Sequence, residues 1–280
     1  MLNWWDMFVG FILGVVEGLT EFAPVSSTGH MILVDDFMLH SKEIFSPQMA
    51  NMFKVVIQLG SILAVVVVFW DRFFQLLGLK RAPVDPELGR AGHSRLKLTQ
   101  VLVGLIPAAV LGLLFEKYID QYLFSIQTVL IGLVLGAVLM VAADWFRPAK
   151  PTAKTVDQVT YMQALGIGLF QCLGLWPGFS RSGSTISGGV LLGMSHRAAA
   201  DFTFIMAVPV MAGASGLSLL KHWKDFSMDA LPFFIVGFIS AFLFALLSIR
   251  FFLKLINRIK LVPFAIYRVV LAAVIYFVFL

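Results

Sequence analysis

Long apolar runs alternate with short polar connections along this chain of 280 residues. A helix needs about 20 apolar residues to cross a bilayer. Six runs satisfy this requirement, so the pattern predicts six transmembrane helices. They lie at roughly 54–70, 98–115, 126–146, 202–220, 231–250 and 263–280.

Two further apolar stretches, at 8–34 and 161–194, carry polar residues near their middle. The first is interrupted within 17–30 and the second within 177–185, which leaves arms that are too short to span a bilayer. Irregular backbone at membrane depth is tolerated only where protein or a wet cavity covers it. We therefore expect each stretch to form a re-entrant helix–loop–helix hairpin.

The two halves of the chain resemble each other. Three short segments recur in the same order, namely 14–17 with 168–171, 103–108 with 236–241 and 136–138 with 272–274. The single membrane domain of residues 1–280 would then contain two repeats, approximately 1–146 and 158–280. Each repeat has one hairpin and three spans. Because three is odd, the repeats are inverted, and a site is expected where their broken helices meet.

Composition excludes most other classes of protein. Hydrophobic residues make up 59% of the chain and charged residues only 13%, with a mean hydropathy of +0.90. Soluble domains carry about 25% charged residues, so a soluble enzyme, a disordered chain and a coiled coil are excluded. Continuous apolar runs disfavour a transmembrane β-barrel. The predicted fold class is an all-α polytopic membrane protein, and its single cysteine, Cys172, rules out an internal disulfide framework.

The distribution of positive charge predicts the orientation. Fourteen of the 21 Lys and Arg residues lie in the segments 71–97, 147–157 and 250–260 or at Arg197. Basic residues concentrate in cytoplasmic loops, so these segments are predicted to be cytoplasmic loops and both termini periplasmic. The same rule accounts for the net charge of +5, and no nucleic-acid partner is expected.

Two acidic residues interrupt the first hairpin. Glu17 and Glu21 are four residues apart and therefore share one helix face. Charges in the hydrocarbon are costly and indicate function by default. Two adjacent carboxylates suit a hard divalent cation, Mg²⁺ or Ca²⁺, or acid–base chemistry. The alternative is a pair of solvated or ion-paired acids in a vestibule.

Hydroxyl groups and a histidine follow these acids. Ser26 or Ser27 is placed to cap the second arm, beside Thr28, with His30 in its first turn. A hydroxyl beside a histidine can supply a nucleophile and a proton shuttle. The alternative is a helix cap with a hydrogen-bonded core histidine.

The second break carries an arginine among hydroxyls. Free amides at a helix start, a guanidinium at Arg181 and several hydroxyls would form an anion cradle. The hydroxyls are those of Ser180, Ser182 and Thr185. The alternative for Arg181 is an ion pair with one of the two acids. Arg268, on the last span, either contacts phosphate as well or extends to the cytoplasmic interface. Together these groups predict phosphoryl chemistry on a membrane-embedded phosphate ester.

At these residues the chain resembles the undecaprenyl-diphosphate phosphatase family, also named BacA or UppP after bacitracin resistance. The matching segments are EGLTE at 17–21, PVSSTGH at 24–30, PGFSRSGST at 177–185 and PFAIYR at 263–268. The resemblance implies removal of the terminal phosphate of undecaprenyl diphosphate, which recycles the lipid carrier for peptidoglycan synthesis. It also implies a divalent cation and a bacterial inner membrane enzyme whose site opens to the periplasm.

The resemblance also implies roles for individual residues. Glu17 and Glu21 would serve the cation or the attacking group, and His30 would act as acid or base. Ser27 would attack phosphorus, or Glu21 would activate a water while Ser27 only positions it. The substrate would be held by Arg181 together with Ser26, Thr28, Ser180, Ser182, Thr185 and Arg268.

Other functions remain open from sequence. Inverted repeats also build transporters, so a lipid-phosphate transporter or flippase is the main alternative, although transport does not require the hydroxyl, histidine and carboxylate cluster. A type-2 phosphatidic acid phosphatase is disfavoured because Ser187 stands where its motif requires histidine. A scaffold would not need buried charges. The expected partners are a polyprenyl diphosphate and membrane lipids, and the sequence leaves a homodimer open.

Overall fold

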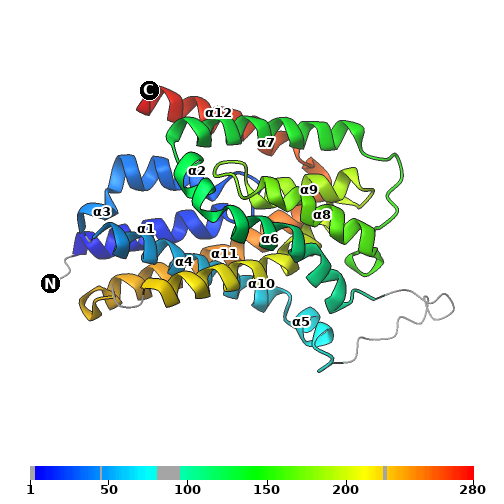
Figure 1. Cartoon of the computed structure of the whole chain (residues 1–280), viewed down its shortest axis with the longest axis horizontal. Helices are drawn as coiled ribbons and strands as arrows, with labels where there is room; N and C mark the ends of the chain where they lie inside the picture. Colours follow the sequence, from blue (N-terminus) through cyan, green and yellow to red (C-terminus); the bar gives the residue numbers. More distant parts are fainter. Residues whose placement is uncertain (1–3, 45, 81–94, 223–225) are drawn as a thin grey trace.

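The computed structural model describes residues 4–44, 46–80, 95–222 and 226–280, which are helical and contain no strand (Figure 1). The longer helices are α1 (Trp4–Thr20), α4 (Pro47–Val68), α6 (Leu98–Tyr122), α7 (Ile126–Phe146), α8 (Tyr161–Leu173), α9 (Arg181–Leu191), α10 (His196–His222), α11 (Leu231–Ile259) and α12 (Val262–Phe279). The shorter elements are α2 (Ser27–Met31), the π-helix η1 (Ile32–Leu39), α3 (Ser41–Ile44), α5 (Trp70–Leu76) and the 3-10 turns η2 (Val156–Gln158) and η4 (Met228–Ala230).

Six of the described helices, α4, α6, α7, α10, α11 and α12, are long and apolar enough to cross a membrane. This confirms the prediction of six transmembrane helices. The start of α4 lies earlier than expected because Pro47 occupies its first turn and the Ser46 hydroxyl accepts the Met49 amide at 3.3 Å.

The prediction of a loop at 250–260 is wrong, because α11 continues to Ile259. Its buried residues Phe252, Leu253 and Ile256 extend the apolar stripe of the helix through this segment, while Arg250 and Lys254 are exposed. The positive charges of this segment therefore lie on a helix end and not on a flexible connection.

An ion pair with a buried carboxylate lies within the N-terminal half. Lys54 is inside α4, and its ammonium contacts the Asp35 carboxylate of η1 at 2.7 Å. Asp35 also accepts the Ser41 amide at 2.9 Å and is fully buried. The sequence-based search for charge at membrane depth overlooked this pair, which fastens η1 to α4.

Both interrupted stretches form two helices separated by a break. The first break lies between Thr20 and Ser27 and the second between Leu173 and Arg181. The helix before each break packs against a span from the other half of the chain, since α1 contacts α11 and α8 contacts α6. Likewise α4 packs against α10, and α7 against α12. The short helix α2 contacts both α7 and α12, and α9 contacts α7, which places the two breaks between the halves.

Glycines allow the close approach of the helices before the breaks. A Cβ atom added at Gly14 would collide with the carbonyl oxygen of Gly237 on α11. A Cβ atom added at Gly168 would collide in the same way with the carbonyl oxygen of Gly104 on α6. Helices of membrane proteins associate through such small residues because apolar surface alone does not drive them together.

Replacing Gly168 by Ala should therefore destabilise the protein. The added methyl group forces α8 away from α6, at an expected cost of about 1–3 kcal/mol. Thermal unfolding of the purified protein in detergent should show a melting temperature lowered by several degrees. Gly216→Ala is the matched control, because nothing lies within 4 Å of its added Cβ. Equal melting temperatures for the two variants would contradict the close approach.

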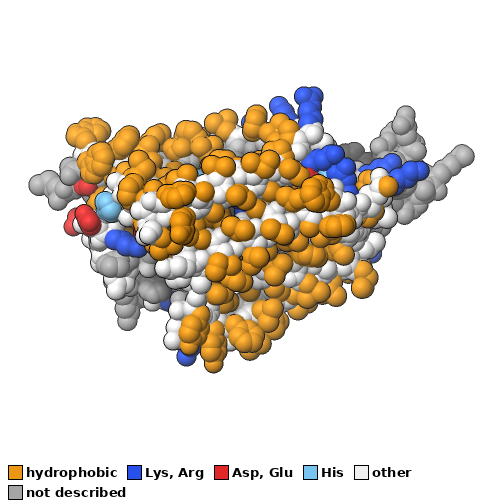
Figure 2. All heavy atoms as spheres, turned by 90° about the horizontal axis from the view of Figure 1, so that it is seen from above, with side chains coloured by type: hydrophobic (Ala, Val, Ile, Leu, Met, Phe, Trp, Pro, Cys, Tyr) orange, Lys and Arg blue, Asp and Glu red, His pale blue; other side chains and the backbone are white. Residues whose placement is uncertain are grey.

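One end of the molecule collects the basic connections. Arg72 pairs with Asp157 at 2.8 Å, Ala153 bridges to Met194, and Arg197 donates to the Leu253 carbonyl at 2.9 Å. These contacts bring the segments after α4, after α7, before α10 and at the end of α11 together. Figure 2 shows hydrophobic side chains over the middle of the visible face, with most Lys and Arg side chains near one end.

Candidate active site

Each break ends in a serine with the same unusual backbone conformation. Ser26 has φ 69° and ψ 98°, and Ser180 has φ 71° and ψ 115°. Non-glycine residues seldom adopt positive φ, and such positions cluster at functional sites. Each serine hydroxyl accepts the amide of a glycine three residues later, Gly29 at 3.4 Å and Gly183 at 3.1 Å. The two breaks thus present similarly built helix starts.

Glu21 joins the two breaks. It lies in the turn after α1, where its Oε2 accepts the Ser27 hydroxyl at 2.6 Å. Its Oε1 accepts a hydrogen bond from Nη2 of Arg181 at 2.9 Å, and Arg181 is the first residue of α9. The Arg181 guanidinium also lies 5.8 Å from the centre of the Phe22 ring. The structure therefore brings together a carboxylate, a hydroxyl and a guanidinium from residues 160 apart in the chain.

Several buried polar atoms beside the breaks lack a hydrogen-bond partner in the part of the chain that the structure describes. They are Glu17 Oε1, Arg181 Nη1 and both side-chain atoms of Gln171. Glu17 and Gln171 are 5% and 3% exposed and occupy the last turns of α1 and α8, respectively. Unpaired buried polar groups cost free energy, so these atoms favour a polar ligand that would satisfy them.

The hydroxyls of the second break are engaged with the backbone. Ser182 donates to the Ala23 carbonyl at 3.2 Å and so fastens the second break to the first. Thr185 is fully buried and donates to the Arg181 carbonyl of its own helix at 2.8 Å. Thr28 is half-buried on α2. The substrate contacts expected of these three residues remain predictions.

His30 is held by two hydrogen bonds. Its Nδ1 donates to the Ser26 carbonyl at 2.8 Å, so in the neutral ring Nε2 accepts from the Tyr267 hydroxyl at 2.7 Å. The two rings stack at 9° with their centroids 5.6 Å apart. The hydrogen-bond partner of Ser27 is therefore Glu21 and not His30, because the Ser26 carbonyl turns the imidazole toward α12.

Arg268 lies beneath the second break. Its guanidinium is fully buried, so the interpretation that it extends to a membrane interface is wrong. Nη2 donates to the carbonyls of Gly132 on α7 and Gly178 in the break, at 3.2 and 2.9 Å. Gly178 has φ 87°, a conformation that favours glycine. Arg268 therefore ties α12, α7 and the break together, and its predicted contact with phosphate is untested.

The chain is similar to known proteins over nearly its whole length. The family model described as "Bacitracin resistance protein BacA" matches residues 10–274. An undecaprenyl-diphosphatase from Geobacillus sp. (strain WCH70) is 72% identical over 274 residues, which cover 98% of each chain. An undecaprenyl-diphosphatase from Bacillus subtilis (strain 168) is 64% identical over 270 residues, which cover 96% of this chain and 97% of the relative. The chain belongs to the BacA family.

The carboxylates of this BacA protein fit a divalent cation. Glu17 and Glu21 lie one helical turn apart, and Glu17 Oε1 is buried without a hydrogen-bond partner from any described residue. The described residues contain no group of three or more His, Cys, Asp or Glu side chains that could enclose a metal ion. Mg²⁺ typically binds through one or two carboxylates together with waters and substrate phosphates, so a pair of acids without a third is compatible with such a cation.

Sequence reasoning missed two residues of the candidate site. Tyr267, beside Arg268, is the partner of His30, and only its place in the segment PFAIYR could have pointed to it. Gln171 corresponds to Glu17 in the repeated segments 14–17 and 168–171, and this correspondence is the signal that could have pointed to it. In both cases the decisive information is a contact or a burial that depends on the folded chain.

Proposed function

We propose that this BacA protein hydrolyses undecaprenyl diphosphate to undecaprenyl phosphate and inorganic phosphate at the cluster of Glu21, Ser27 and Arg181. The observation that carries the proposal is the hydroxyl of Ser27 hydrogen-bonded to a carboxylate whose other oxygen is paired with a guanidinium. The relatives named undecaprenyl-diphosphatase support the same substrate. The product would return as carrier for peptidoglycan synthesis, and high levels of the enzyme would counter bacitracin.

The diphosphate would bind at the start of α9. Arg181 Nη1 has no partner among the described residues, so one donor is available for a phosphoryl oxygen even while Nη2 is paired with Glu21. The helix start adds a favourable dipole and amide donors. A planar guanidinium binds two oxygens at once, and it would neutralise charge that develops on the phosphoryl group.

Ser27 would act as the nucleophile. Glu21 takes the hydroxyl proton as the Ser27 oxygen bonds to the terminal phosphorus, and the bond to the bridging oxygen breaks. Undecaprenyl phosphate leaves, with a proton from His30 in its imidazolium form, because the one proton of the neutral ring is held by the Ser26 carbonyl. Water then hydrolyses the phosphoserine and releases inorganic phosphate. A divalent cation held by Glu17 and Glu21 would supply charge neutralisation to the diphosphate.

The fold around this site would be an inverted repeat with two re-entrant hairpins. Three observations support this proposal. The helix before each break packs against the other half of the chain. Gly14 lies against the Gly237 carbonyl on α11, and Gly168 lies in the same way against the Gly104 carbonyl on α6. Ser26 and Ser180 have the same backbone conformation. With the basic end in the cytoplasm, both termini and the mouth of the site would face the periplasm.

A lipid-phosphate transporter could use the same architecture, so the test must exclude transport. Detergent removes the second compartment, and purified protein should still release phosphate from a polyprenyl diphosphate. The hydrogen bond from Ser27 to Glu21 favours an enzyme over a transporter, since transport needs no activated hydroxyl. Binding of the substrate without phosphate release would instead favour the transporter.

Replacing Tyr267 by Phe should slow the reaction modestly. The ring stack with His30 is kept, but Nε2 loses its 2.7 Å hydrogen bond. Loss of one such bond is worth about 1 kcal/mol, or roughly a fivefold fall in kcat. Steady-state kinetics should show an unchanged KM, and thermal unfolding should show an unchanged melting temperature. An unchanged kcat would remove Tyr267 from the reaction.

A further inference from the structure

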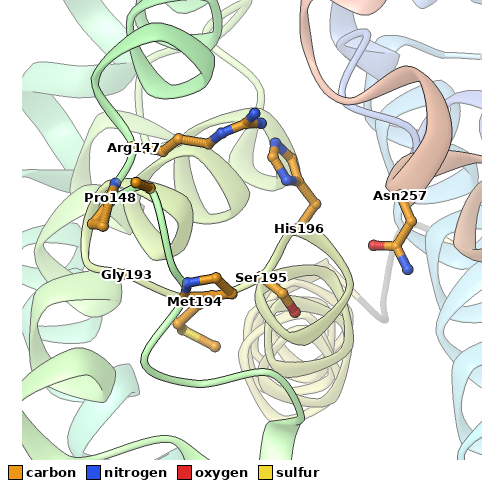
Figure 3. A pocket seen from close by; sticks show the side chains of 9 residues that line it. Arg147, Pro148, Gly193, Met194, Ser195, His196 and Asn257 are labelled. Atoms are coloured by element: carbon orange, nitrogen blue, oxygen red, sulfur yellow. The ribbon is translucent and has the colours of Figure 1, made fainter.

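A pocket of about 240 Å³ opens at the basic end of the molecule (Figure 3). The connection after α7, the start of α10 and the end of α11 line it. Arg147, which ends α7, is eleven residues beyond Gly136, the residue that packs against the second break. At 1.5 Å per residue this is about 16 Å along the helix, so the pocket is separate from the proposed active site.

The pocket presents unused hydrogen-bond donors. In Figure 3 the guanidinium of Arg147 points toward the imidazole of His196, with Asn257 facing them from α11. Arg147 has no hydrogen-bond or ion-pair partner within the described part of the chain. A guanidinium that faces an open space without a partner favours an anion there.

The nearby acid does not neutralise this space. His196 is 8% exposed, and its Nε2 contacts Asp144 Oδ1 at 2.6 Å, which leaves Nδ1 without a partner in the described residues. The other carboxylate oxygen of Asp144 accepts the amides of Leu261 and Val262 at the start of α12. Its charge is therefore partly offset by the amides of a helix start. Helix α10, which begins at His196, adds its own positive dipole end to the pocket.

The surroundings favour a lipid over a free ion. Trp145 and Phe146, directly before Arg147, are each 75% exposed. Tryptophan side chains such as that of Trp145 are enriched at the membrane–water interface. A volume of 240 Å³ is below the range of about 300–1,000 Å³ typical of whole-ligand pockets, so it suits a headgroup whose chains remain outside. Basic pockets between membrane helices bind anionic headgroups.

We propose that this pocket binds the phosphate group of an anionic membrane lipid, with the Arg147 guanidinium as its contact and the acyl chains against Trp145 and Phe146. The site would anchor the basic end of the protein to the leaflet that surrounds it. It is independent of the hydrolytic reaction, and it does not use any residue of the proposed active site.

Binding of short-chain phosphatidylglycerol to the purified protein, followed by native mass spectrometry, tests the proposal. Wild type should bind it in preference to phosphatidylcholine of the same chain length. Arg147→Gln should weaken binding at least tenfold, as expected for loss of a charge-assisted hydrogen bond. Asn257→Leu should weaken it less, and provides a second variant if Arg147→Gln folds poorly.

Two controls separate the site from general electrostatics. Arg250→Gln removes an exposed charge from the same end and should leave binding unchanged. Arg181→Gln should also bind normally, which excludes the active site as the place of binding. Equal losses in Arg147→Gln and Arg250→Gln, or no loss in Arg147→Gln, would overturn the proposal. Competition by inorganic phosphate at the concentrations of the lipid would assign the pocket to the free ion instead.

Discussion

Glu21→Gln is expected to lower kcat/KM for phosphate release from undecaprenyl diphosphate by about a thousandfold, or roughly 4 kcal/mol of transition-state stabilisation. The substitution preserves size but removes the negative charge that pairs with Arg181 at 2.9 Å. It also removes the base that accepts the Ser27 hydroxyl at 2.6 Å and one of the two carboxylates proposed for the cation.

Glu43→Gln provides the matched control. Glu43 is an exposed residue of α3, so the same chemical change there should leave kcat/KM within twofold of wild type. A Glu21→Gln enzyme with more than a tenth of wild-type activity would show that the carboxylate is a structural partner of Arg181 only.

Ser27→Ala separates the two chemical routes. If Ser27 forms the covalent intermediate, as we propose, its loss should abolish both turnover and the phosphoserine trapped from labelled substrate by acid quenching. If Glu21 activates water directly, only one hydrogen bond is lost, and the rate should fall by about tenfold. Undiminished turnover would exclude Ser27 from either role.

Arg181→Gln should be comparably severe. Its guanidinium is the only positively charged side chain that contacts Glu21 in the described structure, and Nη1 is unpartnered. Removal of one preorganised donor to a developing oxyanion typically costs about 10²–10³-fold in kcat. Loss of the Glu21 partner adds to this, because a buried charge left unpaired is itself unfavourable.

Arg181→Lys refines that prediction. Lysine keeps the charge but not the planar fork, and we expect activity between that of wild type and Arg181→Gln. Arg250→Gln, at an exposed position on α11, is the control for net charge. If Arg181→Lys retains full activity, the residue contributes only its charge, and the two-oxygen contact with phosphate is wrong.

The six spans and the two interruptions could be predicted because they depend on local composition. Runs of apolar residues are visible in the sequence, and Pro24 and Pro177 mark the interruptions. The end of α11 could not be predicted from the charges of the segment, because Arg250 and Lys254 are exposed on the helix surface. The helix continues because its other face, with Phe252, Leu253 and Ile256, is buried.

The partners of individual charges were harder to predict. The pairing of Arg181 with one of the two acids was foreseen as an alternative, since opposite charges at membrane depth attract. Asp35 with Lys54 was missed because the partners lie on different elements, and nothing in their spacing indicates a contact. The turn of His30 toward Tyr267 follows from a backbone carbonyl that no motif records.

Phosphate release from undecaprenyl diphosphate by the purified protein in detergent, measured with and without EDTA, tests the central claim most directly. The account predicts release by wild type, loss of release in EDTA, recovery when Mg²⁺ or Ca²⁺ is added in excess, and almost no release by Glu21→Gln under any of these conditions. Release that persists in EDTA and in Glu21→Gln would contradict a reaction centred on the two carboxylates, and a wild-type protein that binds the substrate without hydrolysing it would contradict the proposed function itself.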